Sequence, residues 1–192
     1  MVAVWMFRHG ETLWNQDRRL QGQLDIPLSD TGLRQARAMI QLLHELELNA
    51  IYSSDLMRAY STAVVLADAL SLPLHQHAGF REVHQGQAQG RLVSEIDDLF
   101  GKDAWYKWNN ADPQYWGYSL PQAETKQDAL QRAVQAIEEL DNQYKYDRVA
   151  ICSHGFLMNL LAFVHGEKPD NAIIQNGELW QLKKTVVSGI RQ

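Results

Sequence analysis

The apolar run of residues 2–6 stops at Arg8, His9 and Gly10, and this junction constrains the fold more than any other stretch. A short run rich in β-branched and aromatic residues predicts a strand buried on both faces, as in a parallel sheet. Ligands of open α/β sheets bind beyond the carboxyl ends of the strands. A guanidinium that suits phosphate or carboxylate groups therefore lies where a ligand is expected. The histidine beside it can be a nucleophile, a proton carrier or a metal ligand.

A second apolar run, residues 148–152, ends in the same way. Ser153 and His154 follow it, and Gly155 opens a segment with helical periodicity. The first amides of a helix attract anions, so His154 is expected at an anion-binding position, although a structural role is also compatible with its place. If the two strands are neighbours in the sheet, both histidines face one pocket.

Strand-like and helix-like segments alternate along the rest of the chain. Further strands are expected at residues 50–52, after residues 72–74, and at residues 178–182. Helices are expected after Ser29 or Asp30, after residues 53–55, over residues 130–140 and over residues 155–165. Residues 53–55 offer a cap for their helix, and Tyr60 is expected on its buried face.

This alternation predicts an α/β fold in three layers, with a mostly parallel β-sheet flanked by helices on both faces. We expect residues 1–192 to form a single domain. The periodicity weakens in the middle of the chain, which predicts an insertion of short helices and loops at about residues 84–126.

The composition excludes several classes of protein. The net charge of −5 argues against a nucleic-acid-binding surface, which would be basic. No stretch approaches the ~18 apolar residues that a membrane span requires, and the N-terminus lacks the pattern of a secretory signal. Cys152 is the only cysteine, so an intramolecular disulfide cannot form, and a reducing compartment is favoured. We therefore expect a cytoplasmic protein with neither a nucleic-acid nor a membrane partner.

Five groups of residues form an ordered set of motifs. They are residues 8–15 (Arg-His-Gly-Glu-Thr-Leu-Trp-Asn), residues 21–22 with 27–29, residues 53–56 with Arg58, residues 81–82, and residues 153–155. This set resembles the signature of the histidine phosphatase superfamily, in its phosphoglycerate-mutase-like group. The resemblance runs in the family's order from residue 2 to about residue 180, and a short chance match rarely has such companions.

The resemblance implies a set of residue roles. His9 is implied as the nucleophile that takes a phosphoryl group and forms a covalent phosphohistidine. Glu82 is implied as the proton donor to the departing oxygen, which contributes about 10²–10⁴ in rate. The other implied site residues are the catalytic Arg8, Arg58 and His154, and the substrate-binding Thr12, Asn15, Gln21 and Gly22. No metal or other cofactor is expected, because arginines neutralise the phosphoryl charge.

The reaction type depends on residues outside this shared core. Residues 91–126 carry four basic and six acidic side chains, a poor lining for the bisphosphorylated acid that a mutase holds. Mutases of the family also have an arginine where Val83 stands. We therefore expect a phosphomonoester hydrolase, acting on a small phosphorylated metabolite as a monomer or homodimer. Cofactor-dependent phosphoglycerate-mutase-type transfer, a phosphoprotein (phosphohistidine) phosphatase and a phospho-ligand-binding module remain alternatives.

Some polar residues near the motifs have no assigned role. His75 and His77 alternate on one strand face, but no third ligand accompanies them, so a metal site is not expected. His84 is a candidate substrate contact, because it shares the face of Glu82 if the segment is extended. Gln85 stands where the family commonly has an aromatic residue, so the wall of the pocket differs.

Aromatic residues crowd the insertion. They are Trp105, Tyr106, Trp108, Tyr115, Trp116 and Tyr118. One interpretation is a small satellite core under a loop. The other is a lid that packs on an apolar or ring-bearing leaving group.

Overall fold

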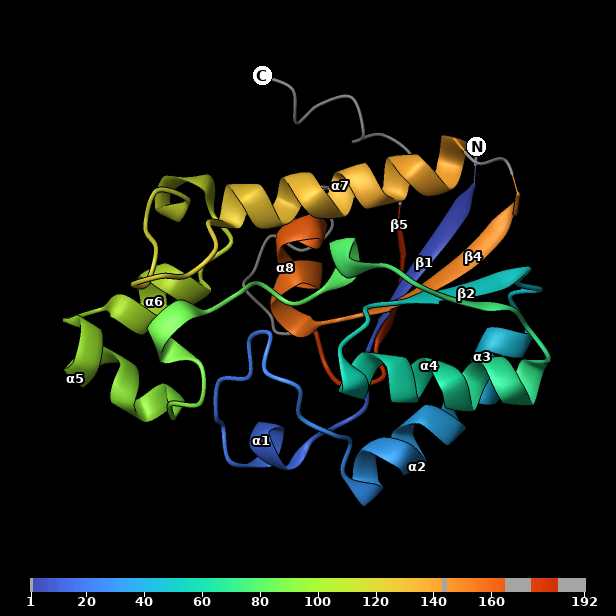
Figure 1. Ribbon diagram of the computed structural model, residues 1–192, viewed down its shortest axis with the longest axis horizontal. Coiled ribbons are helices and arrows are strands. Elements are labelled where there is room, and N and C mark those ends of the chain that lie inside the picture. The colour runs from blue at the N-terminus through green and yellow to red at the C-terminus, as the bar shows by residue number, and fades with distance from the viewer. Residues whose placement is uncertain (1, 143–144, 165–173, 183–192) are drawn as a thin grey trace.

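The computed structural model describes residues 2–142, 145–164 and 174–182, which are built around one five-stranded sheet (Figure 1). The strands are β1 (Ala3–Arg8), β2 (Ala50–Ser53), β3 (Leu74–Gln76), β4 (Arg148–Ser153) and β5 (Leu179–Leu182), in the order β3-β2-β4-β1-β5. All pairs are parallel except β1 with β5. The expected mostly parallel sheet is confirmed, and residues 72–74 lead into β3 as predicted.

Helices cover both faces of this sheet (Figure 1). One face carries α2 (Asp30–Ala38), α3 (Ile40–His44) and α4 (Met57–Leu70), and the other carries α7 (Lys126–Asn142) and α8 (Gly155–Val164). A short helix, α1 (Leu13–Gln16), lies in the loop after β1. None of the helices in the described ranges is both long enough and apolar enough to cross a membrane.

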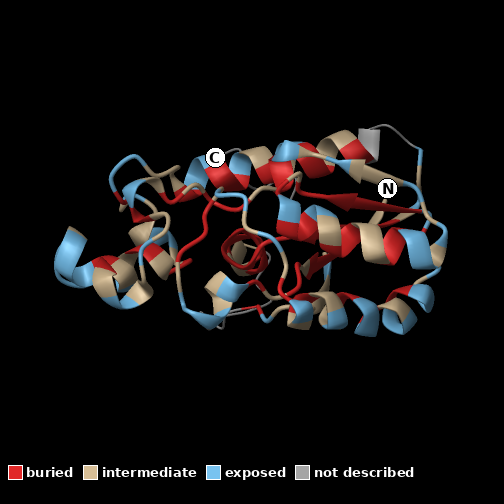
Figure 2. Cartoon of the chain, turned by 60° about the horizontal axis from the view of Figure 1, so that its bottom comes forward, coloured by how far each residue is buried: buried red, intermediate tan, exposed pale blue. Residues whose placement is uncertain are grey.

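Successive residues of β1 belong to different cores. Val4 and Met6 pack with residues of α7 and α8, whereas Trp5 and Phe7 pack with residues of α3 and α4. The sequence of β1 is therefore apolar without alternation, because both faces of the strand are covered. Figure 2 shows this burial in the strands and on the helix faces that turn toward them.

The start of α4 differs from the sequence prediction. Residues 53–55 do not cap it: the N-cap position is Leu56, whose side chain makes no capping bond. Instead, Asp25 Oδ1 accepts a hydrogen bond of 2.6 Å from the Met57 amide. Tyr60 was predicted to be buried and is 39% exposed. Both differences come from tertiary packing, which local periodicity does not encode.

Two other helices follow the sequence more closely. Ser29 caps α2, with its Oγ accepting a hydrogen bond from the Gly32 amide. The helical segment then divides at Met39, which ends α2 and precedes α3. The helix predicted at residues 155–165 is observed as far as Val164, and His165 lies outside the described residues.

The segment 84–126 forms short helical turns and loops, at the left of Figure 1. Its helices are η2 (Gly86–Ala88), η3 (Val93–Glu95), α5 (Ile96–Phe100), α6 (Ala104–Asn109) and η4 (Pro113–Tyr115), and η1 (Ala78–Phe80) precedes them. Trp108 on α6 is fully buried and meets Phe156 of α8 edge-on, with ring centroids 5.6 Å apart. This aromatic residue is therefore part of the core that joins the insertion to the sheet.

A buried lysine holds this core together. Lys126, the first residue of α7, is 0% exposed, and its ammonium donates to the carbonyls of Lys107 at 2.7 Å and Tyr115 at 3.0 Å. The ammonium also lies 5.7 Å from the centre of the Trp108 ring, over its face. Burial lowers the pKa of Lys126 to about 8. One charged group thus ties α6 and the turn at Tyr115 to the long helix.

We expect Lys126→Ala to lower the free energy of unfolding by about 2–4 kcal/mol, because it leaves two buried carbonyls without a charged donor. Urea unfolding at constant pH measures the change. Lys102→Ala is the matched control, since Lys102 is an exposed lysine of the same insertion, and we expect a change within about 0.5 kcal/mol. Equal losses in the two variants would show that the buried ammonium has no special role.

Candidate active site

The carboxyl ends of β1 and β4 bring two histidines together. The strands pair in parallel with Arg8 opposite Ser153, so His9 and His154 leave the sheet side by side. The His9 amide donates to the Ser153 carbonyl at 3.0 Å, and the two imidazole centroids are 5.1 Å apart. Both histidines are buried. Of the two, His9 lines the cleft described below, and His154 is not among its lining residues.

Arg58 lies against His9 from the first turn of α4. Its guanidinium is 1% exposed and donates through Nη1 to the Leu24 carbonyl at 2.8 Å and through Nη2 to the Gly22 carbonyl at 2.7 Å. Its Nε donates to His9 Nε2 at 3.3 Å. Burial lowers the pKa of Arg58 to about 10, so the side chain remains cationic at neutral pH. A fixed positive charge therefore touches the imidazole.

The hydrogen bonds of His9 define its tautomer. Its Nδ1 is 2.6 Å from the Gly10 carbonyl oxygen, which can only accept, so Nδ1 carries the proton. Nε2 then has the free lone pair, and it accepts the hydrogen bond from Arg58 Nε. The imidazole presents a neutral nitrogen toward the cations, which is the form that acts as a nucleophile.

The environment keeps both histidines neutral. Burial, followed by the charges of Arg58 and Arg8, lowers the pKa of His9 well below 6.5, and the bond to the Gly10 carbonyl only partly opposes this. Burial and the charge of Arg58 also lower the pKa of His154 well below 6.5. Neither imidazole adds a positive charge near pH 7.

Several buried polar atoms of the site lack a protein partner. They are Arg8 Nε, Gln21 Oε1, Gln85 Oε1 and both ring nitrogens of His154. Arg8 is held by a bond of 2.6 Å from Nη1 to the Ile174 carbonyl, which leaves its Nε toward the site. Buried donors without partners are rare in folded proteins, and donors from Arg8 and His154 beside His9 suit a tetrahedral anion such as phosphate.

The carboxylate of Glu82 is fixed by backbone amides. Its Oε1 accepts from Val83 and Leu157, both at 2.9 Å, and its Oε2 accepts from Phe156 at 3.0 Å. The last two amides belong to the first turn of α8, where a carboxylate is favoured. All the hydrogen bonds given to this carboxylate by described residues use it as an acceptor. These three bonds fix the position of the carboxylate at the start of α8.

The neutral residues implied by the family motifs differ in whether they line the cleft. Asn15, Gln21 and Gly22 line a cleft of about 200 Å³ with His9 at its base. Thr12 does not line it: Thr12 caps α1, accepting through Oγ1 from the Asn15 amide. Thr12 thus contacts Asn15, and its substrate-binding role stays a prediction from the motif.

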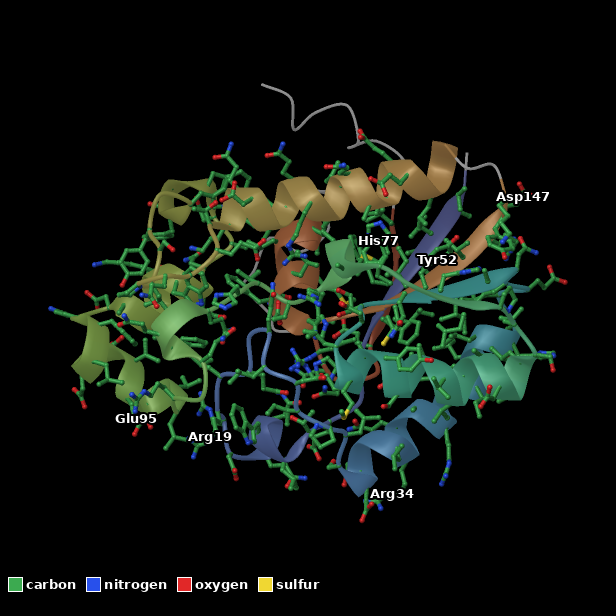
Figure 3. The ribbon with its side chains drawn as sticks, in the orientation of Figure 1. Arg19, Arg34, Tyr52, His77, Glu95 and Asp147 are labelled. Carbon is green, nitrogen blue, oxygen red and sulfur yellow. The ribbon has the colours of Figure 1, made fainter. Side chains whose placement is uncertain are left out.

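The cleft also has walls that sequence motifs did not identify. They are formed by Trp14, Arg18, Arg19, Trp105, Asn109 and Asn159, among others. Arg19 donates to the Gly90 carbonyl at 2.6 Å and stacks on Trp14. Figure 3 shows Arg19 beside the segment that carries Glu95. The one available sequence signal was Trp105, in the aromatic cluster, and it lies in the cleft while Trp108 lies in the core.

The acidic residues of the insertion do not line the cleft, contrary to the inference from its charge count. Glu95 accepts from the Leu92 amide and Asp97 from the Trp105 amide, so both satisfy backbone groups locally. Glu124 forms an ion pair with Arg132 at 2.6 Å. Within the described cleft, Glu82 is the one acidic residue among four arginines. The charge count therefore does not exclude an anionic substrate.

His75, His77 and His84 lie outside the cleft. His84, a candidate substrate contact from sequence, accepts through Nδ1 from the Gly86 amide at 3.1 Å and is not a lining residue. His75 contacts the Tyr146 hydroxyl and His77 contacts Glu139, both at 3.1 Å. These two histidines therefore have different partners, Tyr146 for His75 and Glu139 for His77.

Known proteins share this arrangement. Residues 4–183 match the histidine phosphatase superfamily (branch 1). The chain is similar to "Probable phosphoglycerate mutase GpmB" of Yersinia pestis, with 31% identity over 84% of this chain and 73% of that protein. Among solved structures, mycobacterial glucosyl-3-phosphoglycerate phosphatase has a TM-score of 0.82 and 30% identity, covering 94% of this chain and 92% of that one.

A second structure, YhfR of Bacillus stearothermophilus, has a TM-score of 0.76 and 30% identity, with 88% of this chain and 82% of that chain covered. The family match covers nearly the whole described fold, including both strand ends that carry the histidines. The sheet order, the paired histidines and these matches agree, and the chain belongs to the histidine phosphatase superfamily, branch 1.

Proposed function

We propose that this protein is a phosphatase that hydrolyses small phosphate monoesters through a phosphohistidine on His9. The observation that carries the proposal is the neutral Nε2 of His9, held beside the buried cation of Arg58. A nucleophilic nitrogen next to fixed cations is what transfer of a phosphoryl group from an ester requires. The relatives named as phosphatases support the same reaction.

In the first step, His9 Nε2 attacks phosphorus in line with the ester oxygen. The P–N bond forms while the P–O ester bond breaks, and its electron pair leaves with the oxygen of the alcohol. Arg8, Arg58 and His154 hold the phosphoryl oxygens, with Asn15, Gln21 and Gly22 as neutral contacts. Glu82 passes a proton to the leaving oxygen.

In the second step, water attacks the phosphohistidine. Glu82 takes a proton from the water as its oxygen bonds to phosphorus, and the P–N bond breaks with its electron pair returning to His9 Nε2. Phosphate then leaves, and Glu82 again holds the proton for the next substrate. The backbone amides that bind the Glu82 carboxylate hold it in one position for both steps.

Phosphoglycerate mutase activity is the second candidate, because a relative carries that name. Val83, which is buried and apolar, stands where mutases of the family have an arginine, and this favours hydrolysis. The single cysteine also fits our proposal of a cytoplasmic enzyme. Parallel assays separate the two activities: phosphoglycerate isomerisation, stimulated by the bisphosphate and faster than hydrolysis of every ester tried, would overturn the phosphatase proposal.

We expect His9→Ala to reduce kcat for p-nitrophenyl phosphate by about 10³-fold or more, because no phosphohistidine can form. Quenching in alkaline detergent with ³²P-labelled substrate should show a phosphoenzyme that is then lost on treatment with acid, in the unaltered protein only. His44→Ala is the control, since His44 is an exposed histidine on α3. Substantial turnover in His9→Ala would show that His9 is not the nucleophile, and His154 would then be tested in that role.

The lowered pKa of His9 predicts an unusual pH profile. An ordinary imidazole loses about nine-tenths of its neutral form between pH 7.5 and 5.5. A pKa well below 6.5 moves this loss to lower pH, so we expect the single-turnover rate of phosphoenzyme formation to show no fall centred near pH 6.5. A loss of rate with a midpoint near pH 6.5 would contradict this.

Glu82→Gln should affect esters according to their leaving group. We expect phosphoenzyme formation from an alkyl phosphate to slow by about 10²–10⁴-fold, because an alkoxide must be protonated as it leaves. The rate from p-nitrophenyl phosphate should fall by less than about 10-fold, since its leaving group needs no proton. Single-turnover measurements separate this step from hydrolysis, and Glu45→Gln, an exposed site, is the control. Equal losses on both esters would show that Glu82 donates no proton.

A further inference from the structure

Gln85 is a buried amide with an unused acceptor in the wall of the cleft. The residue is 6% exposed, its Oε1 has no hydrogen-bond partner, and it lines the cleft together with Glu82. Buried acceptors without a donor are destabilising, so such an atom in a binding cleft points to a group of the ligand. The two-step chemistry described above makes no use of this side chain.

The backbone holds Gln85 in place. Its backbone N–H donates to Gln89 Oε1 at 3.4 Å. Gln85 also pairs with Ala123 in an isolated β-bridge and directly precedes η2. Gly86, the next residue, has a φ of +54°, and a Cβ there would lie 2.1 Å from the Pro121 carbonyl oxygen. The segment therefore has little freedom to turn the amide away from the cleft.

We propose that Gln85 is a specificity-determining residue that hydrogen-bonds a hydroxyl group on the alcohol portion of the substrate, an inference that rests on the proposed phosphatase function. A carboxamide has an accepting oxygen and a donating nitrogen, and a hydroxyl can partner either one. A carboxylate can only accept and an ammonium can only donate. A hydroxyl is thus the group that satisfies Gln85 in either orientation of its amide.

The other walls of the cleft are compatible with such an alcohol. Trp14 and Trp105 contribute aromatic surface, and Asn109 and Asn159 contribute two further carboxamides. Sites for polar ligands combine apolar walls with a few placed hydrogen-bonding groups. The substrate class that follows is a phosphate monoester of a polyol or sugar, rather than of a plain alkyl alcohol.

Gln21 is the other cleft glutamine with an unpartnered Oε1, but it matches a phosphate contact of the family motif. Gln85 has no counterpart in that motif and follows Glu82, the proposed donor to the leaving oxygen. The two amides are therefore assigned to different parts of the substrate, Gln21 to the phosphoryl group and Gln85 to the alcohol.

Two esters of equal chain length test the proposal. Glycerol 1-phosphate carries hydroxyls on its alcohol carbons, and n-propyl phosphate carries none. We expect the unaltered protein to favour the glycerol ester in kcat/KM by about 10-fold, as one hydrogen bond predicts. Gln85→Met, which keeps the length of the side chain, should reduce this ratio to nearly 1. Gln87→Met is the matched control, because Gln87 is exposed on the same turn and does not line the cleft.

The outcomes separate this inference from the function on which it rests. If the unaltered protein forms phosphohistidine and hydrolyses both esters equally, or if Gln85→Met keeps the full preference, Gln85 does not read a hydroxyl. If no ester is hydrolysed and no phosphohistidine forms, the phosphatase proposal fails and this inference fails with it. Thermal unfolding checks that Gln85→Met folds, and Gln85→Ala replaces it if it does not, with the same loss of preference expected.

Discussion

The buried guanidinium of Arg58 is the interaction on which the site depends. A cation taken out of water is costly unless polar groups replace the solvent. Here two backbone carbonyls, of Gly22 and Leu24, and the imidazole of His9 take that place. The loop after β1 must therefore curl over the start of α4, and its cleft residues are fixed by the same bonds. Burial and, after it, the same Arg58 charge lower the pKa of His9 and keep it neutral.

Much of the fold and of the candidate site was predictable, because the sequence patterns that indicate them are local. Each of the two apolar strands ends at a histidine, and parallel strands place their carboxyl ends at one edge of the sheet. The fold and the meeting of His9 with His154 follow from that rule. Arg58 and Glu82 came from motif resemblance alone, since an arginine on a helix and one acid among many carry no signal by themselves. Their positions against His9 and α8 agree with the implied roles, which remain proposals for catalysis.

The errors have a common physical origin in the direction of side chains. The acidic residues of the insertion suggested a negatively charged surface around the substrate. In the structure, Asp97 accepts a hydrogen bond from a backbone amide, and Glu124 forms an ion pair with Arg132. Asp25 caps a helix far along the chain, and Lys126 is fully buried although lysine is normally exposed. The sequence shows which charged side chains are present, but tertiary contacts determine the direction of each side chain.

The position of β1 within the sheet has a consequence for the order in which the protein is assembled. β1 leaves the ribosome before β2 and β3, yet its two neighbours in the sheet, β4 and β5, follow all of these in the sequence. Both edges of this apolar strand stay unpaired until residues beyond 148 have been synthesised. Pairings so distant in sequence form late and slowly, and unpaired strand edges favour aggregation in the meantime. His9, at the end of β1, is thus made long before His154, which it meets across the pair of β1 with β4.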